Sequence, residues 1–355
     1  MAPRAAPVRD RISSAVPPAA AFGTAAVLPA ILLIWGALGG GWPLWLGFIW
    51  MAIAAPVADT VIARGFGDAP EGADFPLADA VSILLAMVHF ALLVAVLVAF
   101  GGAWLGMAER VALFLGAGMF FGQVSNSNAH ELIHRSRRGL FRLGSAVYVS
   151  LLFGHHVSAH RLVHHVHVAT AADPNSARLG EGFWHFLARA WPGSFRAGLM
   201  AEQARARASG RMNPYVIWVG GAVVCVVAVT LILGLRVGAD YVAICLYAQM
   251  QLMLSDYVQH YGLHRETRDG RTEPVGPRHS WDAPHPLSSL AMLNAPRHSD
   301  HHAHPSREYP ALRLARDENP RPVLPYSLPV MGAIAMVPPL WRRMMDRRVA
   351  RMRAK

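Results

Sequence analysis

Six near-continuous apolar runs, each close to the length of a membrane-spanning helix, restrict this chain to a small set of folds. They cover residues 21–40, 42–63, 80–100, 103–123, 216–235 and 239–255. A helix of roughly 20 apolar residues is long enough to cross the hydrocarbon core of a bilayer. Only 15% of the residues are charged, against about 25% in an ordinary soluble domain. The sequence therefore predicts an all-α membrane protein with six transmembrane helices.

The arginines predict how these helices are oriented. The interval 124–215 contains eleven arginines and four acidic residues, and the chain after residue 256 contains sixteen basic and nine acidic residues. Because cytoplasmic loops carry an excess of Arg and Lys, we expect both segments and both termini to lie in the cytoplasm. The protein is then a multi-pass protein of the cell (inner) membrane, and its net charge of +11 reflects this topology and contact with membrane lipid. No nucleic-acid-binding motif accompanies the basic residues, so no nucleic acid partner is expected.

Composition divides the chain into three parts. Segment 1–20 is rich in Arg, Pro and Ala and is predicted to be disordered, 21–340 to form one membrane domain, and 341–355 to form a basic C-terminal tail. The first apolar run follows three arginines, but it exceeds the about 7–15 apolar residues of a signal peptide, so we expect a retained helix. Segment 140–154 is apolar but too short to span a bilayer and is expected to be interfacial or re-entrant.

Nine histidines in four clusters are the second informative feature. The clusters are His-Glu-Leu-Ile-His at 130–134, His-Arg-Leu-Val-His-His at 160–165, Asp-Tyr-Val-Gln-His at 256–260 and His-Ser-Asp-His-His at 298–302. Spacings of three and four residues bring side chains to one face of a helix, so each cluster can direct imidazoles at one point. Imidazole binds iron, zinc, copper and nickel. Since one such ion uses about three or four protein ligands, nine histidines predict two ions.

The rest of the composition favours iron. The chain has two cysteines, Cys225 and Cys245, both inside predicted spans, so neither a disulfide framework nor thiolate ligation is expected. Few carboxylates lie near the histidines, which argues against the Glu-rich di-iron bundles. A nitrogen-ligated pair of irons next to a bilayer suits an enzyme that activates oxygen and acts on an apolar substrate.

These residues resemble the integral-membrane alkane 1-monooxygenases, with the related xylene monooxygenases, within the wider membrane desaturase and hydroxylase superfamily. The resemblance covers roughly residues 20–305 and is most specific at His130–Arg135, in the run from His160 to Glu181, and at Arg297–Ala303. The segment Tyr257–Gly262 is more characteristic of alkane hydroxylases than of desaturases. The resemblance implies an all-α, six-span fold with a cytoplasmic, histidine-rich di-iron cap.

The resemblance also implies the chemistry. The implied iron ligands are His130, His134, His160, His164, His165, His260, His298, His301 and His302. Two iron ions would use O₂ to hydroxylate the terminal carbon of a medium-chain alkane, with electrons from a rubredoxin or ferredoxin and its NAD(P)H reductase. Ala159 and Gln259 depart from the family pattern, which usually has Glu at the first position and often at the second. The same di-iron site would serve a fatty acyl desaturase or hydroxylase or an aromatic-methyl monooxygenase, and these alternatives stay open.

Other polar and aromatic residues receive more limited predictions. Glu131 and Asp300 lie inside ligand clusters, where a carboxylate can accept a hydrogen bond from an imidazole and orient it. His89 and Asp59 lie within predicted spans, where a polar group needs a partner, so we expect hydrogen-bonding roles for them. Trp50 is a candidate for the wall of a substrate tunnel.

Further predictions concern the remaining histidines and the basic surface. His155, His156 and His167 are expected to be hydrogen-bonded neighbours or surface residues, and His279 an ordinary polar loop residue. Four arginines could dock an acidic electron donor, a hypothesis that charge reversal and the salt dependence of turnover would test. They are Arg135, Arg137, Arg138 and Arg142.

Overall fold

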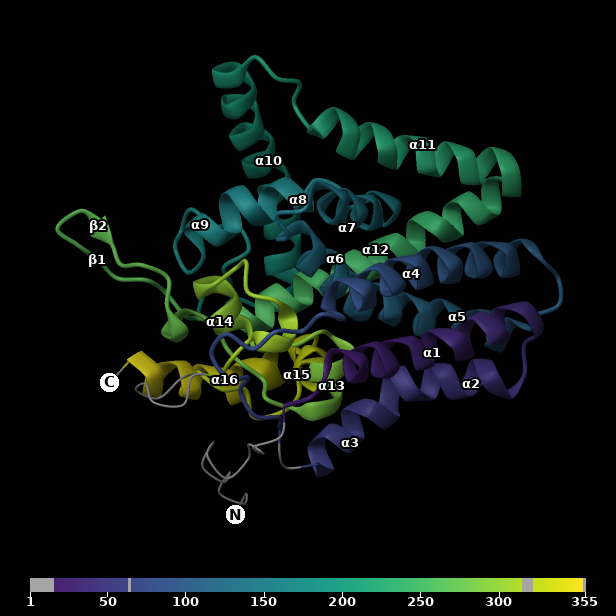
Figure 1. Cartoon of the computed structure of the whole chain (residues 1–355), viewed down its shortest axis with the longest axis horizontal. Coiled ribbons are helices and arrows are strands. Elements are labelled where there is room, and N and C mark those ends of the chain that lie inside the picture. Colours follow the sequence, from purple (N-terminus) through teal and green to yellow (C-terminus); the bar gives the residue numbers. More distant parts are fainter. Residues whose placement is uncertain (1–15, 63–64, 315–321, 354–355) are drawn as a thin grey trace.

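The protein is an elongated bundle of helices, described by a computed structural model for residues 16–62, 65–314 and 322–353 (Figure 1). The only strands in these residues are the two of a short hairpin, β1 (Thr267–Arg268) and β2 (Arg271–Thr272). The predicted all-α class is confirmed. Of the N-terminal segment predicted to be disordered, residues 1–15 lie outside the described residues, and helix α1 begins at Ala19.

Five helices are long and apolar enough to cross a membrane. They are α1 (Ala19–Gly39), the continuous helix formed by α2 (Trp42–Ile49), η2 (Trp50–Ala54) and α3 (Ala55–Val61), then α4 (Ala78–Gly101), α11 (Tyr215–Leu233) and α12 (Leu235–His260). The run 103–123 begins later than predicted, at Met107, and continues without a break as α5 (Met107–Met119), η3 (Phe120–Ser125) and α6 (Asn126–Ile133). Its first turn contains Glu109 and Arg110. The count of six spans therefore stays a prediction.

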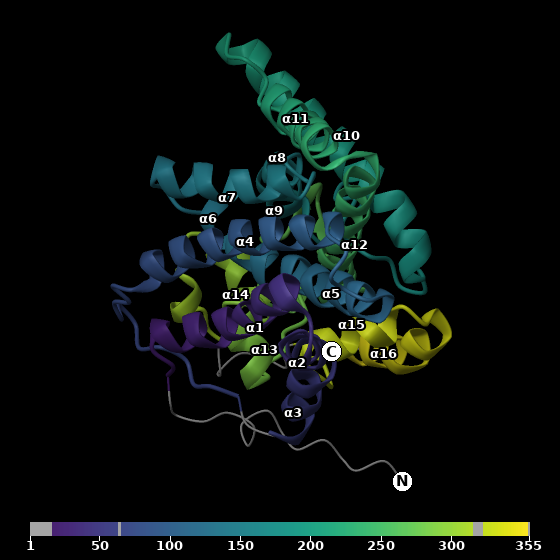
Figure 2. The same cartoon turned by 90° about the vertical axis from the view of Figure 1, so that its right-hand side faces the viewer.

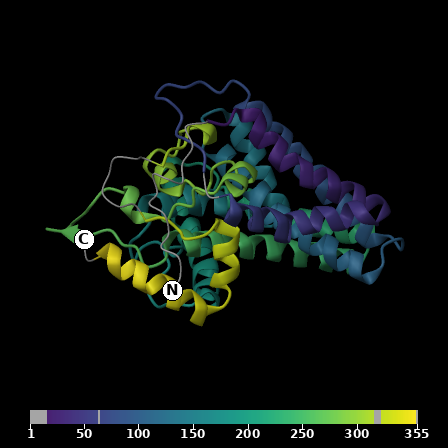
Figure 3. The ribbon, with the colours of Figure 1, turned by 90° about the horizontal axis from the view of Figure 1, so that it is seen from below.

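The hairpin turns of the long helices lie at one end of the molecule. The α1–α2, α4–α5 and α11–α12 connections are all on the right in Figure 1. The opposite end carries the shorter elements that follow these helices, and Figure 3 shows the yellow C-terminal helices there, away from the purple and blue hairpin ends. As predicted, α6 and α12 extend to this end with His130 and His260. Helices that span the molecule thus deliver the histidines to one end.

The remaining helices, most of them short, form a cap at this end. Its members are α7 (Arg138–Ser150), α8 (His156–Ala159), η4 (His160–His164), α9 (His165–His167), α10 (Phe183–Ser209), η5 (Pro277–His279), α13 (Pro286–Ala291), α14 (His298–Ala303), η6 (Tyr309–Ala311), α15 (Leu328–Ala335) and α16 (Pro338–Arg353). The segment expected to be interfacial, 140–154, forms most of α7, and the turned view shows α10 and α11 projecting beyond it (Figure 2).

The described part of the basic C-terminal segment, residues 341–353, is not a separate tail. Residues up to Arg353 belong to α16, whose Trp341, Met345 and Val349 are fully buried. Trp341 packs against Tyr257 and Tyr261, next to the histidine-bearing end of α12. The basic residues of α16 leave one apolar face at helical spacing, and burial of this face holds the segment against the cap.

Two buried polar side chains connect distant elements, as their positions in apolar runs predict. The ring nitrogens of His89, in α4, lie 2.9 Å from the hydroxyls of Ser125 and Ser150. The carboxylate of Asp59, in α3, accepts hydrogen bonds from the backbone N–H groups of Leu287 and Ser288 at 2.7 and 2.9 Å. Asp59 therefore satisfies the free N–H groups at the start of α13, as an N-cap side chain would.

We expect Asp59→Ala to lower the thermal unfolding temperature, because it removes both acceptors at the start of α13, a loss of about 1 kcal/mol. Asp59→Asn, which keeps one oxygen acceptor, should lose less. The measurement is unfolding of the purified chain in detergent. Equal unfolding temperatures for Asp59→Ala and the unchanged chain would show that α13 does not depend on this contact.

Candidate metal centre

The structure brings the nine predicted histidines together in two adjacent clusters. The first contains His130, His134, His160, His165 and His301, and the second contains His164, His260, His298 and His302. Within each cluster, one ligand nitrogen from every histidine lies within 4.8 Å of all the others. The clusters touch, because the ring centroids of His165 and His302 are 4.6 Å apart.

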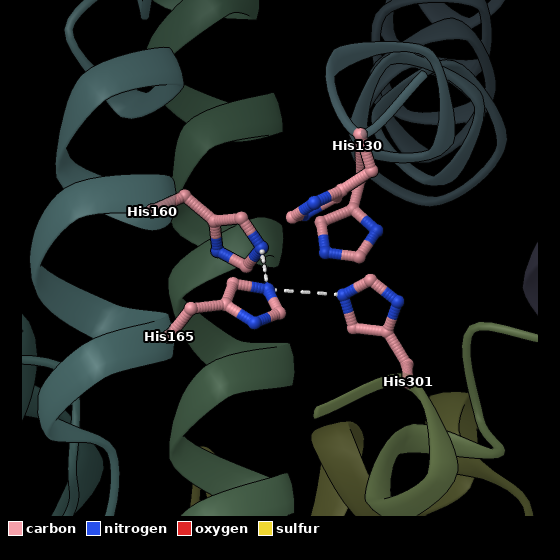
Figure 4. A group of neighbouring side chains, drawn as sticks. His130, His160, His165 and His301 are labelled. Carbon is pink, nitrogen blue, oxygen red and sulfur yellow. Dashed lines mark hydrogen bonds between the residues drawn. The ribbon is translucent and has the colours of Figure 1, made fainter. Parts of the chain in front are cut away.

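A π-helical turn decides how the middle histidines are distributed. In η4, the backbone N–H of His165 bonds to the carbonyl of His160, five residues earlier. This wider turn places His160 and His165 on one side, where both face His130 and His301 (Figure 4). His164 then points into the second cluster. Single π turns inside α-helices are frequent at functional sites.

Helix α14 is divided in the same way. His298 and His302, four residues apart, share one face of the helix and belong to the second cluster. His301 belongs to the first cluster. Both η4 and α14 therefore supply histidines to both clusters, and the two sites are parts of one centre.

The nitrogen geometry fits metal ligation better than hydrogen bonding. His165 Nε2 lies 2.8 Å from His160 Nε2 and 3.1 Å from His301 Nε2. His298 Nε2 likewise lies 3.0 Å from His260 Nε2 and 3.1 Å from His302 Nε2. One ring nitrogen holds at most one proton, so hydrogen bonds at both distances would require both neighbouring rings to carry a proton on the nitrogen that faces the cluster. Nitrogens bound at right angles to an ion, each about 2.1 Å away, would be about 3.0 Å apart.

Buried ring nitrogens without a hydrogen-bond partner also indicate a metal site. The Nε2 atoms of His130, His134 and His164 are buried without a hydrogen-bond partner among the described residues. A buried polar atom without a partner is costly, and a metal ion would supply one. The donor set, which is imidazole without thiolate, suits iron, zinc, copper or nickel. The residues present therefore fit a metal centre.

Burial keeps most of these imidazoles neutral, as ligation requires. It lowers the pKa of His130 to about 3. It also lowers the pKa values of His160 and His301 well below the usual range, with a further contribution from the neighbouring rings. Neutral imidazoles carry free lone pairs. They can therefore bind a cation at neutral pH without first losing a proton.

His164 has a different environment. Its Nδ1 lies 2.9 Å from a carboxylate oxygen of Asp173, and both side chains are buried. Burial alone would lower the pKa of His164, but the charge and hydrogen bond of Asp173, together with the charge of Asp256, outweigh it and raise this pKa. With Nδ1–H donating to Asp173, the Nε2 lone pair of His164 is directed into the second cluster. A carboxylate behind a ligand imidazole fixes its tautomer and orientation.

Asp173 is itself held in place. It accepts hydrogen bonds from the backbone N–H of Asn175 and the hydroxyl of Ser176 at 3.0 and 2.7 Å, and the side chain of Asn175 donates to Asp256 at 2.7 Å. The sequence interpretation did not single out Asp173 as the orienting carboxylate. The available signal was an acidic residue in the polar turn directly after the second histidine cluster.

The two carboxylates predicted to orient imidazoles have other partners. Glu131 pairs with Arg135 and accepts from the backbone N–H of Tyr309. Asp300 binds Arg307 and His304, the second of which belongs to neither cluster. Adjacent residues of a helix point in different directions, so Glu131 and Asp300 cannot face the ring that precedes or follows them. They hold the cap together around the centre.

The two departures from the family pattern have structural explanations. Ala159 packs against α10 at Gly198, where an added Cβ would lie 3.0 Å from the Ala159 Cα. A longer side chain at Ala159 or at Gly198 would separate α8 from α10. The amide of Gln259 accepts from Ser255 at 2.8 Å and donates to the carbonyl of Ala295 at 3.2 Å. Gln259 therefore connects the end of α12 to the loop before α14.

Several other predictions differ from the structure. His155 and His156 were expected to be hydrogen-bonded neighbours or surface residues, but both are buried against aromatic rings. The ring of His156 is stacked on that of Phe153, with the ring centroids 5.0 Å apart. His279 is also buried, and it contacts Glu273 at 3.0 Å.

The predicted docking arginines are also partly engaged. Arg135 and Arg137 form ion pairs with Glu308 and Asp79, respectively. The Arg137 side chain is nevertheless 75% exposed, and docking of an electron donor at the four arginines stays a prediction.

An apolar cavity of about 520 Å³ lies between the spans on the side of α12. Its walls come from η2, α5, η3, α12 and α15, and they include Met51, Ala52, Met119 and Ser255. Trp50, the predicted tunnel residue, is not among the lining residues, although it is partly buried against the core. The neighbouring Met51 and Ala52 occupy that position.

Comparisons with known proteins show which family the chain resembles. The family model for fatty acid desaturase matches residues 103–335. An alkane 1-monooxygenase of Alcanivorax borkumensis is 32% identical over 333 residues, which cover 87% of this chain and 79% of that protein. An alkane 1-monooxygenase of Pseudomonas putida is 32% identical over 336 residues, covering 89% and 81%. The xylene/toluene monooxygenase hydroxylase component of Pseudomonas putida is 26% identical over 220 residues, covering 60% and 57%.

We expect Asp173→Ala to weaken metal retention by roughly 10–100-fold, because His164 loses the carboxylate that orients it. The measurement is metal content of the purified chain during titration with a chelator. Glu131→Gln is the matched control, since Glu131 contacts Arg135 and Tyr309 instead of an imidazole. Loss of metal from Glu131→Gln but not from Asp173→Ala would reverse the assignment.

Proposed function

This chain belongs to the alkane 1-monooxygenase family, within the membrane fatty acid desaturases and hydroxylases, and on that premise we propose that it hydroxylates the terminal carbon of medium-chain alkanes. The observation that carries the proposal is the pair of adjacent clusters built from nine histidines at one end of a bundle of apolar helices. A bilayer would dissolve such a substrate, and a centre at the end of apolar helices would let an alkane approach without passing through water.

Two iron ions are the proposed cofactors, one in each cluster. When bound, they would supply the redox chemistry that activates O₂ and replaces a C–H bond by C–OH, which zinc cannot do. One oxygen atom enters the alcohol and the other leaves as water, with two electrons from the donor and two protons. The chain holds the nitrogen ligands, and Asp173 keeps the proton of His164 on Nδ1, away from the metal side.

The apolar cavity of about 520 Å³ is the proposed substrate site. Its wall includes Leu254 and Ser255, one helical turn before the histidine-bearing end of α12, and Ser255 bonds to Gln259. Apolar walls that restrict an alkane to one orientation would present its terminal carbon to the centre, and orientation of this kind is a major source of rate and selectivity.

The electron donor is proposed to be a rubredoxin or ferredoxin, which an NAD(P)H-dependent reductase would reduce. The two cysteines, Cys225 and Cys245, are both free and too few to hold an iron–sulfur cluster, so electrons would have to come from another protein. The proposed location is the cell inner membrane, with the histidine-bearing end in the cytoplasm, because the arginine-rich segment 124–215 and the described residues 257–314 and 322–353 follow the spans towards that end. A soluble donor would then reach the cap directly.

A second candidate is a fatty acyl desaturase or hydroxylase, or an aromatic-methyl monooxygenase of the xylene type. It is favoured by the desaturase family match and by the similarity to the xylene/toluene component. The metal site would be the same, and the product distinguishes the two: an alkene or a benzylic alcohol instead of a 1-alkanol.

The proposal predicts two irons per chain and 1-alkanols from a C8–C16 alkane series, in membranes supplied with rubredoxin or ferredoxin, reductase and NADH. His130→Ala and His164→Ala, which each remove a nitrogen from a different cluster, should lower iron content and abolish alcohol formation. Iron without alkane products would move the substrate to acyl or aromatic compounds. A chain that binds no iron would contradict the proposal.

Narrowing the cavity should shorten the preferred alkane. We expect Ala52→Phe, which adds a ring to the cavity wall, to shift 1-alkanol formation towards shorter chains in the same assay. Ile53→Phe is the matched control, because Ile53 is 55% exposed on the outer side of the same helix. If both variants keep the original chain preference, the cavity is not the substrate site.

A further inference from the structure

A large groove, separate from the proposed substrate cavity, lies beneath the projecting helices α10 and α11. It has a volume of about 1340 Å³, above the roughly 300–1,000 Å³ of typical small-molecule sites. Its walls are α7, the α8–η4 segment, the C-terminal half of α10 and the first turns of α11. Figures 1 and 2 both show α10 and α11 projecting away from the bundle above α7 and α8.

The rim of this groove is strongly basic. Five arginines line it: Arg138, Arg142, Arg161, Arg205 and Arg211. None of them forms an ion pair with a carboxylate of the described residues. Arg161 and Arg205 are close enough for their charges to repel each other, and the charge of Glu202 offsets part of this repulsion at Arg161. The groove contains one acidic residue, Glu202, which is buried and accepts a hydrogen bond from Ser158 at 2.8 Å.

The floor of the groove is apolar. Phe141, Val149, Leu162 and Ile217 line it, and the guanidinium of Arg161 lies 5.0 Å above the ring of Phe141. The groove opens onto α11, the most exposed of the candidate spans, since only 6% of its apolar window is buried inside the protein. An acyl chain could therefore follow α11 from the bilayer while its headgroup stays at the arginines.

We propose that this groove binds an anionic phospholipid, with its phosphate held by the rim arginines and an acyl chain on the apolar floor. Guanidinium groups bind phosphate oxygens in a bidentate manner, and basic pockets between membrane helices bind anionic headgroups. An alkane would not need the arginines, and a soluble acidic protein would leave the apolar floor uncovered. Charge and apolar surface together fit a lipid.

The bound lipid would also contact the metal centre's supporting helix. Arg161 and Leu162 line the groove, whereas His160 and His164 of the same π turn belong to the two clusters. Occupation of the groove would therefore brace η4 from the side opposite the histidines.

The test is native mass spectrometry of the full chain, released from nanodiscs that contain equal amounts of phosphatidylglycerol and phosphatidylethanolamine. We expect retention of phosphatidylglycerol. Each arginine near a membrane surface contributes about fivefold to anionic lipid binding, so Arg142→Gln/Arg205→Gln should lower this retention by roughly tenfold or more. The matched control is Arg196→Gln/Arg207→Gln, which removes two exposed charges from α10 outside the groove and should retain the lipid.

A second variant separates the groove from general surface charge. Ala146→Trp fills the groove but keeps every arginine, and it should also reduce lipid retention. Equal retention in Ala146→Trp and the unchanged chain, or equal retention of both lipids, would overturn the proposal. So would displacement of the lipid by inorganic phosphate, or a bound second copy of the chain. A slower reaction with the electron donor at unchanged lipid retention would assign the arginines to the donor instead.

Lipid retention is measured without turnover. The result is therefore independent of the proposed alkane hydroxylation, and either proposal can fail while the other stands.

Discussion

Nine imidazoles, six of them buried and three partly buried, direct nitrogen lone pairs towards one another, and this requirement governs the rest of the structure. Protonating such rings would bury like charges, so burial lowers the pKa values of most of them. Neutral rings with facing nitrogens in turn need a cation between them. The carboxylate of Asp173 stabilises the arrangement from outside by holding the proton of His164 on the far nitrogen. A metal centre satisfies all of these conditions together.

The fold meets this requirement by combining long helices with short, irregular ones. Helix α6 brings His130 and, at its C-cap, His134 to one end of the bundle, and α12 brings His260. The segment His160–His165 and α14 each contribute histidines to both clusters. Because η4 and α14 each contribute to both clusters, neither site can be displaced without the other. The cap around them is held by buried ion pairs such as Arg135 with Glu131, and by the packing of Trp341 from α16.

Hydropathy and histidine spacing were enough to predict the helical class, five of the spans and the set of converging histidines. They could not assign each histidine to a cluster, because the π turn at His160–His164 changes which side chains share a side, and α-helical spacing does not anticipate it. Sequence proximity also favoured Glu131 and Asp300 over Asp173, although neighbouring helical residues diverge and a loop can fold back. The basic composition of α16 concealed its apolar face for a similar reason: three buried residues four positions apart are a weak signal among arginines.

Iron X-ray absorption combined with Mössbauer spectroscopy of the ⁵⁷Fe-loaded chain tests the central claim most directly. The account predicts two irons per chain, each surrounded by nitrogen or oxygen ligands at about 2.1 Å and without a sulfur shell. A single iron per chain, or an iron–sulfur distance of about 2.3 Å, would contradict the assignment of the two histidine clusters as one di-iron centre.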